Sequence, residues 1–547
     1  MDIKEQLSAA IRQAAQKAIA DGVFPAGELA DILLEVPPDK KFGDFATNFA
    51  MQSARVFRMN PKKIAEELVS RIEGDWLDHA EIAGPGFINF YLKGNVLYDL
   101  LRHIYEGGEA CFNLPQKDTA RIMVEYVSAN PTGLLHVGHG RGAAVGSALV
   151  NLLRAAGYPV HSEYYINDAG NQIDNLAASV NARYLELLGK ETVFPENGYH
   201  GADIIDTAKR IVEADGEKYL SLSEEQRLTA FKEIALKEKL AQLKEDLAAF
   251  NVTFDEWFSE RTLHPEAVRD ACQTLKEKGK VYDKDGALWL RSTDYGDDKD
   301  RVVIRDNGVP TYLAADIAYH RNKLERGFGH LINIWGADHH GYIARLKAAV
   351  HFLGYDESRL EIILMQMVNL LKDGQTYKMS KRAGNAILMS DVLAAIGRDA
   401  MRFIFISKKG ETPLEFDVDE LAREDSSNPI FYINYAHARV NQIFTKAGKR
   451  EADVLGADFC TLDEAGLGLA FAALGLNEIL NDAFNSRGLQ KLPDFLKALA
   501  ADFHKYYNEN RVVGSENEDA KLKLFALVAL SIRTAFALMG LSAKEKM

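Results

Sequence analysis

The segment RIMVEYVSANPTGLLHVGHGR, residues 121–141, is the most informative part of the sequence. It begins with an apolar, β-branched run, continues through a turn cluster that contains Pro and Gly, and is followed by Val, Leu and Ala at helical spacing up to Ala156. This order predicts a strand, a turn and a helix. His136 and His139 are then expected where the helix begins, above the carboxyl end of the strand.

A helix N-terminus in this position is suited to a phosphate group. Its unpaired N–H groups and the positive end of the helix dipole favour an anion. Two imidazoles there can donate hydrogen bonds to a phosphoryl oxygen that gains charge, and Gly138 has no Cβ, so a planar base can lie against the backbone. By composition alone, a chance H-x-G-H would be rare, although the chain has 14 His and 41 Gly.

A second segment, KMSKR at 378–382, lies between turn residues and is predicted to be a mobile cationic loop. Taken alone, it is equally consistent with a solvated surface loop and with an anion site. Together with the histidine segment, it favours ATP chemistry. We expect Lys378 and Lys381 to follow the β- and γ-phosphates as pyrophosphate leaves.

The two segments resemble the ATP motifs of class I aminoacyl-tRNA synthetases, and SANPTGLLHVGHGR with YKMSKRAGN resembles the arginyl-tRNA synthetases in particular. The resemblance covers nearly the whole chain. PPDKKFGDFATNFA (37–50) and GPGFINFYL (84–92) resemble that family's N-terminal tRNA-binding module. NPIFYINYAHAR (428–439) resembles the start of its helical anticodon-binding domain.

This resemblance implies ATP-dependent ligation of L-arginine to its cognate tRNA through an arginyl-adenylate, with release of AMP and pyrophosphate. It further implies that tRNA is needed even for adenylate formation and that the enzyme is a monomer. ATP would bring Mg²⁺, mainly through its phosphates. The catalytic residues implied are His136, His139, Lys378 and Lys381, and the ATP-binding residues are Gly138, Gly336, Asp338, His339, Met379, Ser380 and Arg382.

Selection of arginine requires a carboxylate that meets the guanidinium fork, with an aromatic ring nearby. The sequence offers Glu125, Asn130, and Tyr312 with Asp316 one helical turn apart. The resemblance places all four in the amino-acid pocket. Asp316 and Tyr312 are then expected at the guanidinium, and Asn130 at the α-amino or carboxylate end. Without the resemblance, a strand-capping Glu125 and a surface Tyr312–Asp316 pair would be the simpler interpretation.

The expected contacts to tRNA come from both ends of the chain. Phe87, Asn89 and Tyr91 share one face of a predicted strand, which suits a protein core as well as an RNA platform. The resemblance favours RNA, and in the C-terminal domain it points to Tyr435, His437 and Arg439. The net charge of −14 would repel RNA overall, so local basic patches are required.

The expected fold class is α/β. A doubly wound, parallel, Rossmann-like catalytic domain should occupy 118–405, with an insertion at about 190–300. An α+β module at 1–110 precedes it, and an all-helical domain at 406–547 follows. Within the catalytic domain the patterns predict strands at 121–127, 159–166, 331–336 and 361–368, and helices at 139–156, 170–188 and 223–249.

The composition is typical of a cytoplasmic enzyme. The three cysteines, Cys111, Cys272 and Cys460, form no C-x-x-C pair, so neither zinc, nor another protein-bound metal, nor a disulfide framework is expected. The most apolar stretch near the C-terminus is interrupted by Arg533, and we expect it to be too short to span a membrane.

Two other functions are compatible with parts of the sequence. A small-molecule nucleotidyltransferase could use the same histidine motif, but it would have no use for the outer domains. A non-catalytic RNA-binding protein could keep the synthetase fold, but the intact His136, His139, Lys378 and Lys381 argue against this.

Overall fold

The computed structural model describes residues 3–35, 37, 40–93, 112, 120–372, 374–376 and 387–547. They fall into two compact units, Met1–Cys111 with Ala452–Phe471 and Glu516–Leu524, and Phe112–Glu451 with Ala472–Ser515 and Phe525–Met547. The predicted cationic loop, with Lys378, Met379, Ser380, Lys381 and Arg382, lies outside the described residues.

The N-terminal module has the predicted α+β composition. Its three-stranded antiparallel sheet has the order β1-β3-β2, with Phe45 opposite Phe90. One face of the first helix buries Ile3, Leu7 and Ile11 at helical spacing, and they share a core with Phe90 of the sheet. The elements are α1 (Ile3–Ala20), β1 (Phe45–Thr47), α2 (Phe49–Phe57), α3 (Pro61–Val69), β2 (Leu77–Ala83) and β3 (Phe87–Leu92).

The catalytic domain is built on a five-stranded sheet with the order β11-β10-β4-β5-β6, in which every neighbouring pair is parallel. The chain fills one half of the sheet from β4 outward and then returns to fill the other half from β10. This is the predicted doubly wound arrangement, and its switch point lies between β4 and β10. The strands are β4 (Ile122–Glu125), β5 (Val160–Ile166), β6 (Glu256–Ser259), β10 (His330–Gly336) and β11 (Leu360–Met365).

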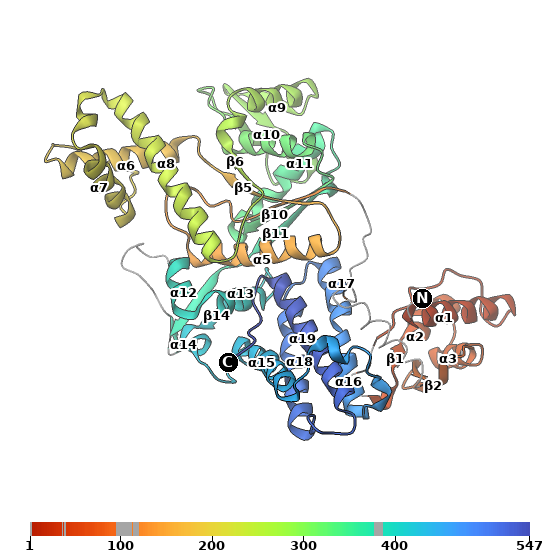
Figure 1. The fold of residues 1–547 in the computed structure, drawn as a ribbon. Coiled ribbons are helices and arrows are strands. Elements are labelled where there is room, and N and C mark those ends of the chain that lie inside the picture. Colours follow the sequence, from red (N-terminus) through yellow and green to blue (C-terminus); the bar gives the residue numbers. More distant parts are fainter. Residues whose placement is uncertain are drawn as a thin grey trace. The chain divides into compact units, whose positions relative to one another are not determined.

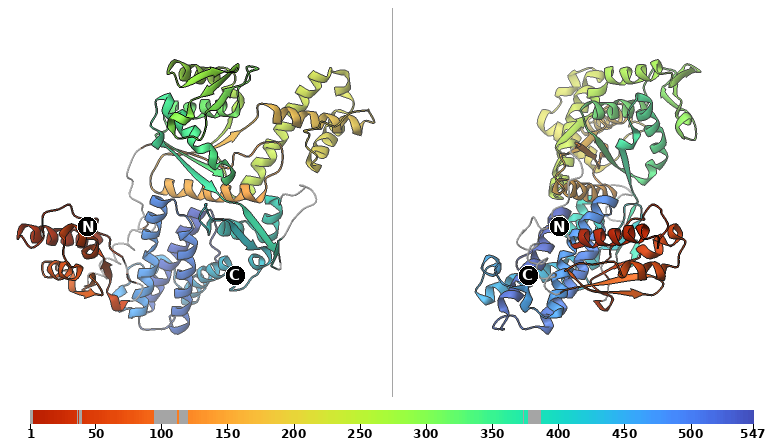
Figure 2. Two further views of the ribbon diagram at one scale, coloured as in Figure 1. Left: turned by 180° about the vertical axis from the view of Figure 1, so that it is seen from behind. Right: turned by 90° about the vertical axis from the view of Figure 1, so that its right-hand side faces the viewer.

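Helices connect the strands and cover both faces of this sheet (Figures 1 and 2). One helix follows β4 along one face, and on the other side a group of three helices packs through Ile317 and Tyr319 against Tyr165 and Phe258 of the strands. A separate arm of three helices has its own core around Phe231. These helices are α5 (Val137–Ala155), then α9 (Glu266–Glu277), α10 (Tyr312–Glu325) and α11 (Ile343–Leu353), and in the arm α6 (Asn171–Leu187), α7 (Ala202–Asp215) and α8 (Glu224–Ala249).

The segment expected as an insertion at about 190–300 also contributes to the central sheet. Its strand β6 pairs in parallel with β5, with Glu256 opposite Glu163. The rest of the segment divides into the helical arm, α9 and part of a small antiparallel sheet made of β7 (Val281–Lys284), β8 (Ala287–Leu290) and β9 (Arg301–Ile304). Because β6 has only four residues, its sequence shows no periodicity from which a strand could be predicted.

Helix α5 lies unusually close to the strand that precedes it. A Cβ on Gly146 would lie 2.4 Å from the ring of Tyr126, directly after β4. Only glycine at this position lets the helix backbone approach the aromatic ring. The close approach packs the middle of α5, the helix that begins with the HVGH motif, against the chain directly after β4.

A second small sheet, with the order β13-β12-β14, follows the central one. It is built from β12 (Val368–Lys372), β13 (Gln375–Thr376) and β14 (Leu414–Asp417), with the helices α12 (Met389–Ile396), α13 (Arg398–Ile406) and α14 (Val418–Ala422). The remaining chain is helical, as predicted, and comprises α15 (Pro429–Ala447), α16 (Glu464–Leu474), α17 (Leu476–Ser486), α18 (Lys491–Glu509) and α19 (Glu518–Met539).

The C-terminal helix corrects one expectation. With 22 residues and a mean hydropathy of 1.8, α19 is long and apolar enough to cross a membrane. Arg533 does not interrupt the helix. Its guanidinium extends away from the helix and forms an ion pair with Glu451. However, 83% of the apolar stretch is buried inside the protein, as in the core helix of a soluble protein.

Candidate active site

The two histidines of the HVGH motif (residues 136–139) cap helix α5. The Nδ1 atom of His136 accepts a hydrogen bond from the Gly138 N–H at 3.2 Å, and the Nδ1 atom of His139 accepts one from the His136 N–H at 3.2 Å. The two rings are stacked, with centroids 3.6 Å apart. Since each Nδ1 is an acceptor, each neutral ring carries its proton on Nε2.

Both imidazoles are neutral at physiological pH. Burial lowers the pKa of His136, and burial together with the neighbouring His136 lowers the pKa of His139 to about 3. The positive end of the α5 dipole also favours the neutral form. The helix N-terminus therefore presents two fixed Nε2–H donors, which can stabilise negative charge on a phosphoryl oxygen without being cations themselves.

The chain that follows the cationic segment returns to this motif. The Val137 N–H donates to the Ile387 carbonyl at 2.9 Å, and the Met389 N–H donates to the Leu135 carbonyl at 2.8 Å. Leu388 and His136 thereby form an antiparallel bridge. Ile387 is the first described residue after the cationic segment.

Gly336, Asp338 and His339 lie at the carboxyl end of the neighbouring strand. Gly336 ends β10, which extends three residues past the pair formed by Asn333 and Glu125. The side chains of Asp338 and His339 are exposed on the following 3₁₀ turn, Ala337–Tyr342. They are on the same edge of the sheet as the histidine motif.

Asp316, in the second turn of α10, lies near two other carboxylates, those of Glu125 and Glu260. The Tyr342 hydroxyl donates to Asp316 Oδ2 at 2.6 Å. Burial raises the pKa of Asp316 to about 7; the Tyr342 hydrogen bond opposes this shift, and the charges of Glu125 and Glu260 add to it. A raised carboxyl pKa beside two further carboxylates is an environment in which a cation would be stabilised.

Glu125 is neither a simple strand cap nor a free carboxylate. Its Oε1 atom accepts from the Ser128 hydroxyl at 3.0 Å, and its Oε2 atom accepts from the Lys323 ammonium at 2.5 Å. Glu125 is 6% exposed. Tyr312, in contrast, is largely exposed at the start of α10, and Asn130 is exposed in the turn after β4. The sequence alone favoured Tyr312 and Asp316 as a pair of surface residues. Only Tyr312 is exposed, because Asp316 is half-buried.

A buried polar network connects the two acidic positions. His320 Nδ1 donates to the Asp316 carbonyl at 2.8 Å, and its Nε2 accepts from Asn333 at 2.7 Å. The Lys323 ammonium then bridges Asn333 Oδ1 and Glu125. Asp316, His320 and Lys323 recur at helical spacing, which places them on one face of α10. This spacing is a sequence signal for His320 and Lys323, whereas Glu260 and Tyr342 come from distant segments.

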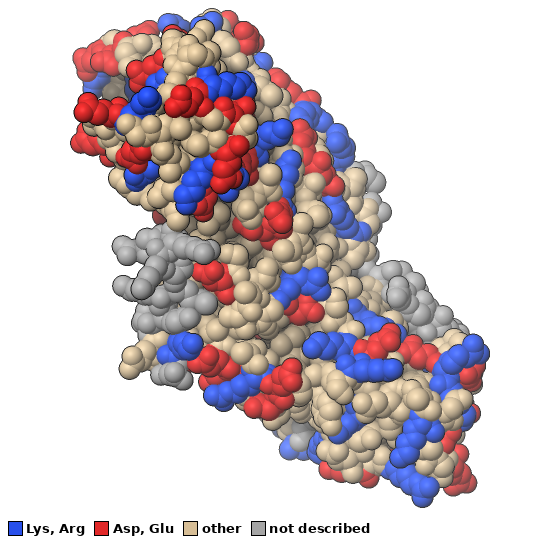
Figure 3. All heavy atoms as spheres, turned by 60° about the vertical axis from the view of Figure 1, so that its left-hand side comes forward, with Lys and Arg blue, Asp and Glu red and all other residues tan. Residues whose placement is uncertain are grey.

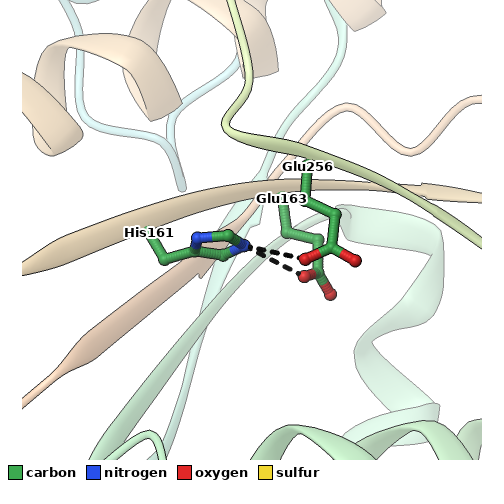
Figure 4. A group of neighbouring side chains, drawn as sticks. All are labelled: His161, Glu163 and Glu256. Carbon is green, nitrogen blue, oxygen red and sulfur yellow. Dashed lines mark ion pairs between the residues drawn. The ribbon is translucent and has the colours of Figure 1, made fainter. Parts of the chain in front are cut away.

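His161, Glu163 and Glu256 form a second acidic group, with all three ligand atoms within 4.8 Å of one another (Figure 4). The Arg326 guanidinium donates to both carboxylates at 2.6 Å and lies 3.3 Å from His161 Nε2. Although burial alone would raise it, hydrogen bonds from His161 and Arg326 lower the pKa of Glu163 to about 2. This geometry is that of a partly buried ion cluster, in which the guanidinium occupies the place that a metal ion would need.

In the N-terminal module, the predicted RNA face is separate from the core. Ile88, Phe90 and Leu92 of β3 point into the core, so Phe87, Asn89 and Tyr91 alternate onto the other face. Asn89 is buried, and Tyr91 stacks on His79 with centroids 4.1 Å apart.

In the helical domain, Tyr435 and Arg439 border a pocket of about 390 Å³. The Arg439 guanidinium lies over the rings of Tyr435 and Tyr507, 4.4 and 4.5 Å from their centroids. His437 is 2% exposed and donates through Nδ1 to the Lys544 carbonyl at 2.9 Å. Its side chain therefore faces the protein interior, and it can support a surface only indirectly.

Surface charge does not by itself locate an RNA site. On the face shown in Figure 3, Lys and Arg side chains are interspersed with Asp and Glu side chains. This distribution agrees with the net charge of −14.

Three family models together match almost the whole chain. The arginyl tRNA synthetase N terminal domain matches residues 2–92, the class I (R) tRNA synthetase catalytic domain matches 107–444, and the DALR anticodon binding domain matches 433–547.

Individual relatives agree with the family models. An arginine–tRNA ligase from Campylobacter curvus is 51% identical over 518 residues, covering 94% of this chain and 97% of the relative. The corresponding protein from Campylobacter concisus is 52% identical over 520 residues, with the same coverage. The fold matches Thermus thermophilus arginyl-tRNA synthetase at a TM-score of 0.78, with 22% identity and all of both chains covered.

Proposed function

The chain belongs to the arginyl-tRNA synthetase family, and on this premise we propose how its own residues ligate L-arginine to tRNA. As a class I arginine–tRNA ligase, it uses ATP, L-arginine and an arginine-accepting tRNA. This assignment removes the two alternatives, a small-molecule nucleotidyltransferase and a non-catalytic RNA-binding protein.

The first step is attack of the arginine carboxylate on the α-phosphate of ATP. No enzyme nucleophile is required, so the protein acts by positioning and by stabilising charge. In our proposal the Nε2–H groups of His136 and His139 donate to the α-phosphoryl oxygen, and Gly138 leaves space for the base. Gly336, Asp338 and His339 contact the remainder of ATP from the end of β10.

The cationic segment supplies the leaving-group side of the reaction. We assign Lys378 and Lys381 to the departing pyrophosphate, and Met379, Ser380 and Arg382 to ATP binding. The support is the bridge between Leu388 and His136.

Arginine binds, in our proposal, with its guanidinium among the carboxylates of Glu125, Glu260 and Asp316. The observation that carries this assignment is the raised pKa of Asp316, to about 7, which burial and the two neighbouring carboxylates cause. A guanidinium is always charged and forms bidentate pairs with carboxylates. Tyr312 borders the guanidinium, and Asn130 meets the α-amino or carboxylate end.

This proposal predicts that arginine binding releases a proton. In the empty enzyme the pKa of Asp316 is about 7, and a bound cation must lower it. Affinity should therefore rise with pH, by up to about tenfold per unit, until pH 7 and then level off. Calorimetric titrations at pH 6.5 in two buffers of different ionisation enthalpy should show release of roughly half a proton or more per arginine, and almost none at pH 8.5.

The control for proton release is Asp316→Asn, which should remove the buffer dependence at pH 6.5. Titrations should be made on the enzyme alone and on its complex with tRNA, because tRNA can be needed to complete the site. Arginine binding without proton uptake or release at pH 6.5 in both states would mean that Asp316 does not meet the substrate cation.

We propose that tRNA is bound by the outer domains. In the helical domain the supporting observation is the pocket beside Tyr435 and Arg439, where an aromatic ring and a guanidinium offer faces on which an unpaired base can stack. His437 holds the adjoining segment through Lys544. In the N-terminal module we assign Phe87 and Tyr91 to RNA contacts, with the buried Asn89 supporting that face.

Replacing Tyr435 with alanine is expected to raise KM for tRNA about five- to thirtyfold, because one stacked base is worth about 1–3 kcal/mol. kcat at saturating tRNA, and KM for ATP and arginine, should stay near the parent values. Steady-state aminoacylation over a range of tRNA concentrations measures this effect. Tyr435→Phe keeps the ring and should restore KM; an equal loss in the two variants would exclude stacking.

We also propose that Mg²⁺ accompanies ATP and is held mainly by its phosphates, with no zinc or other resident metal in the enzyme. We propose a cytoplasmic, monomeric enzyme with the domain division 1–110, 118–405 and 406–547.

A further inference from the structure

Arg141 lies two residues after His139 on α5, and its side chain is fully buried at 0% exposure. Its guanidinium donates to three backbone carbonyls. Nη1 donates to Gln366 and Thr412, and Nη2 donates to Lys409, each at 2.9 Å. One side chain thus joins the helix of the first ATP motif to two other segments of the chain.

No carboxylate among the described residues pairs with this buried guanidinium. Burial lowers the pKa of Arg141 to about 10, so the cation is retained at a cost in desolvation. If the site needed only packing, an apolar side chain would be at least as stable. What arginine adds is a rigid planar fork that holds several acceptors in one fixed geometry.

The three carbonyls lie shortly before the first residues of β12 and β14. Gln366 connects β11 to β12, and its N–H donates to the Gly410 carbonyl at 2.8 Å. Lys409 and Thr412 belong to the loop before β14, which pairs in parallel with β12. Strand β12 then turns into β13, whose last residue is Thr376, just before the cationic segment.

Backbone hydrogen bonds hold the same part of α5 at a second place, because Ile387 and Met389 pair with Val137 and Leu135 beside His136. The start of α5 is thus attached through Arg141 to the segments before β12 and β14, and through this pairing to the chain that leads into α12.

We propose that Arg141 is a positioning residue for adenylate formation, which fixes the start of α5, with the HVGH histidines, relative to β12 and the loop before β14. This role rests on the function proposed above for the first ATP motif. Arg141 touches neither ATP nor arginine in this proposal, so it should affect the ATP step and leave the amino-acid pocket unchanged.

The test is Arg141→Lys, which keeps the charge but replaces the planar fork with a single ammonium group. We expect the rate of arginine-dependent ATP–pyrophosphate exchange, with tRNA present, to fall about 10- to 100-fold, since a misplacement of about 1 Å is sufficient for such a loss. The Kd of arginine, and the rate of transfer from preformed arginyl-adenylate to tRNA, should change less than about threefold.

A second variant tests the same junction without changing Arg141. A Cβ on Gly410 would lie 2.8 Å from the Leu364 carbonyl and 2.2 Å from Met365 Cε, so Gly410→Ala must shift the loop that carries Lys409 and Thr412. It should give the same selective loss of exchange, and it keeps the proposal testable if Arg141→Lys does not fold.

Arg359→Lys is the matched control. Arg359 precedes the opposite end of β11 and donates to the carbonyls of Gly329 and Phe328. Its replacement should lower thermal stability at most, with normal exchange.

Normal exchange in folded Arg141→Lys, together with impaired exchange in His139→Ala, would overturn the positioning role. Equal losses in exchange, transfer and arginine affinity would also overturn it, since they indicate general damage. If exchange is normal in His139→Ala, the function proposed for the first motif is wrong. This result distinguishes failure of the proposed function from failure of the positioning role.

Discussion

Asp316→Asn is expected to lower kcat/KM for arginine by about 30- to 1000-fold, because a cation in a partly buried site loses a charged partner at a cost of about 2–4 kcal/mol. The asparagine can still accept from Tyr342, so the local hydrogen bond is kept. KM for ATP should change little, because the two histidines and the adjoining backbone are not altered. Steady-state aminoacylation with arginine and ATP varied separately measures both quantities.

Stability gives an independent check on this variant. The folded-state pKa of Asp316 is raised to about 7 by burial and by Glu125 and Glu260, so at pH 8 ionised Asp316 disfavours the folded, empty enzyme. Above pH 7, Asp316→Asn should therefore not lower the free energy of unfolding. Asp306→Asn, in the exposed turn before α10, is the control for a lost surface charge. Equal losses of arginine and ATP affinity would show that the guanidinium is bound elsewhere.

The parts of the fold that were predictable are those with long, regular patterns. The strand before HVGH and helix α5 occupy nearly the predicted residues, because each combines a continuous apolar pattern with a clear turn signal. Strand β6 has four residues, two of them charged or hydroxylated, and pairs with a strand about ninety positions earlier, so local periodicity carries no information about it.

The same limit applies to the candidate site. His136, His139, Asp316 and Tyr312 lie in short motifs, so their types and spacing are visible in the sequence. Glu260 joins Asp316 only through the fold, as does Tyr342. His437 shows the opposite case, because its motif suggested an RNA contact and the structure places its side chain against Lys544, in the interior.

The charge states of the two proposed sites also could not be derived from residue types. Burial, together with the charges of Glu125 and Glu260, raises the pKa of Asp316, which in our proposal prepares the site for the arginine cation. Burial lowers the pKa of both histidines, so in the proposed mechanism neutral rings at a helix N-terminus hydrogen-bond to ATP without binding its ground-state charge as tightly as cations would. The proposal assigns the charge that develops as pyrophosphate leaves to the lysines of the second motif.

His139→Ala is expected to lower the rate of arginine-dependent ATP–pyrophosphate exchange by about 100- to 1000-fold, the usual cost of removing one donor to a transition-state oxyanion. The Kd of arginine should be unchanged. In the parent enzyme, burial and the neighbouring His136 lower the pKa of His139 to about 3, so the protonation of His139 should contribute no slope to the exchange rate between pH 6 and pH 8.

The control is His351→Ala, which removes an exposed histidine that bonds to Glu357 on the far side of the domain core. His139→Asn retains an N–H donor and should recover part of the rate, which a purely structural role for the ring would not predict. Saturating ATP and tRNA are used throughout, so that weaker binding is not mistaken for slower chemistry. If His139→Ala keeps the parent exchange rate under these conditions, the α-phosphate is not stabilised by this ring, and the reaction must depend on the helix N–H groups and the second motif alone.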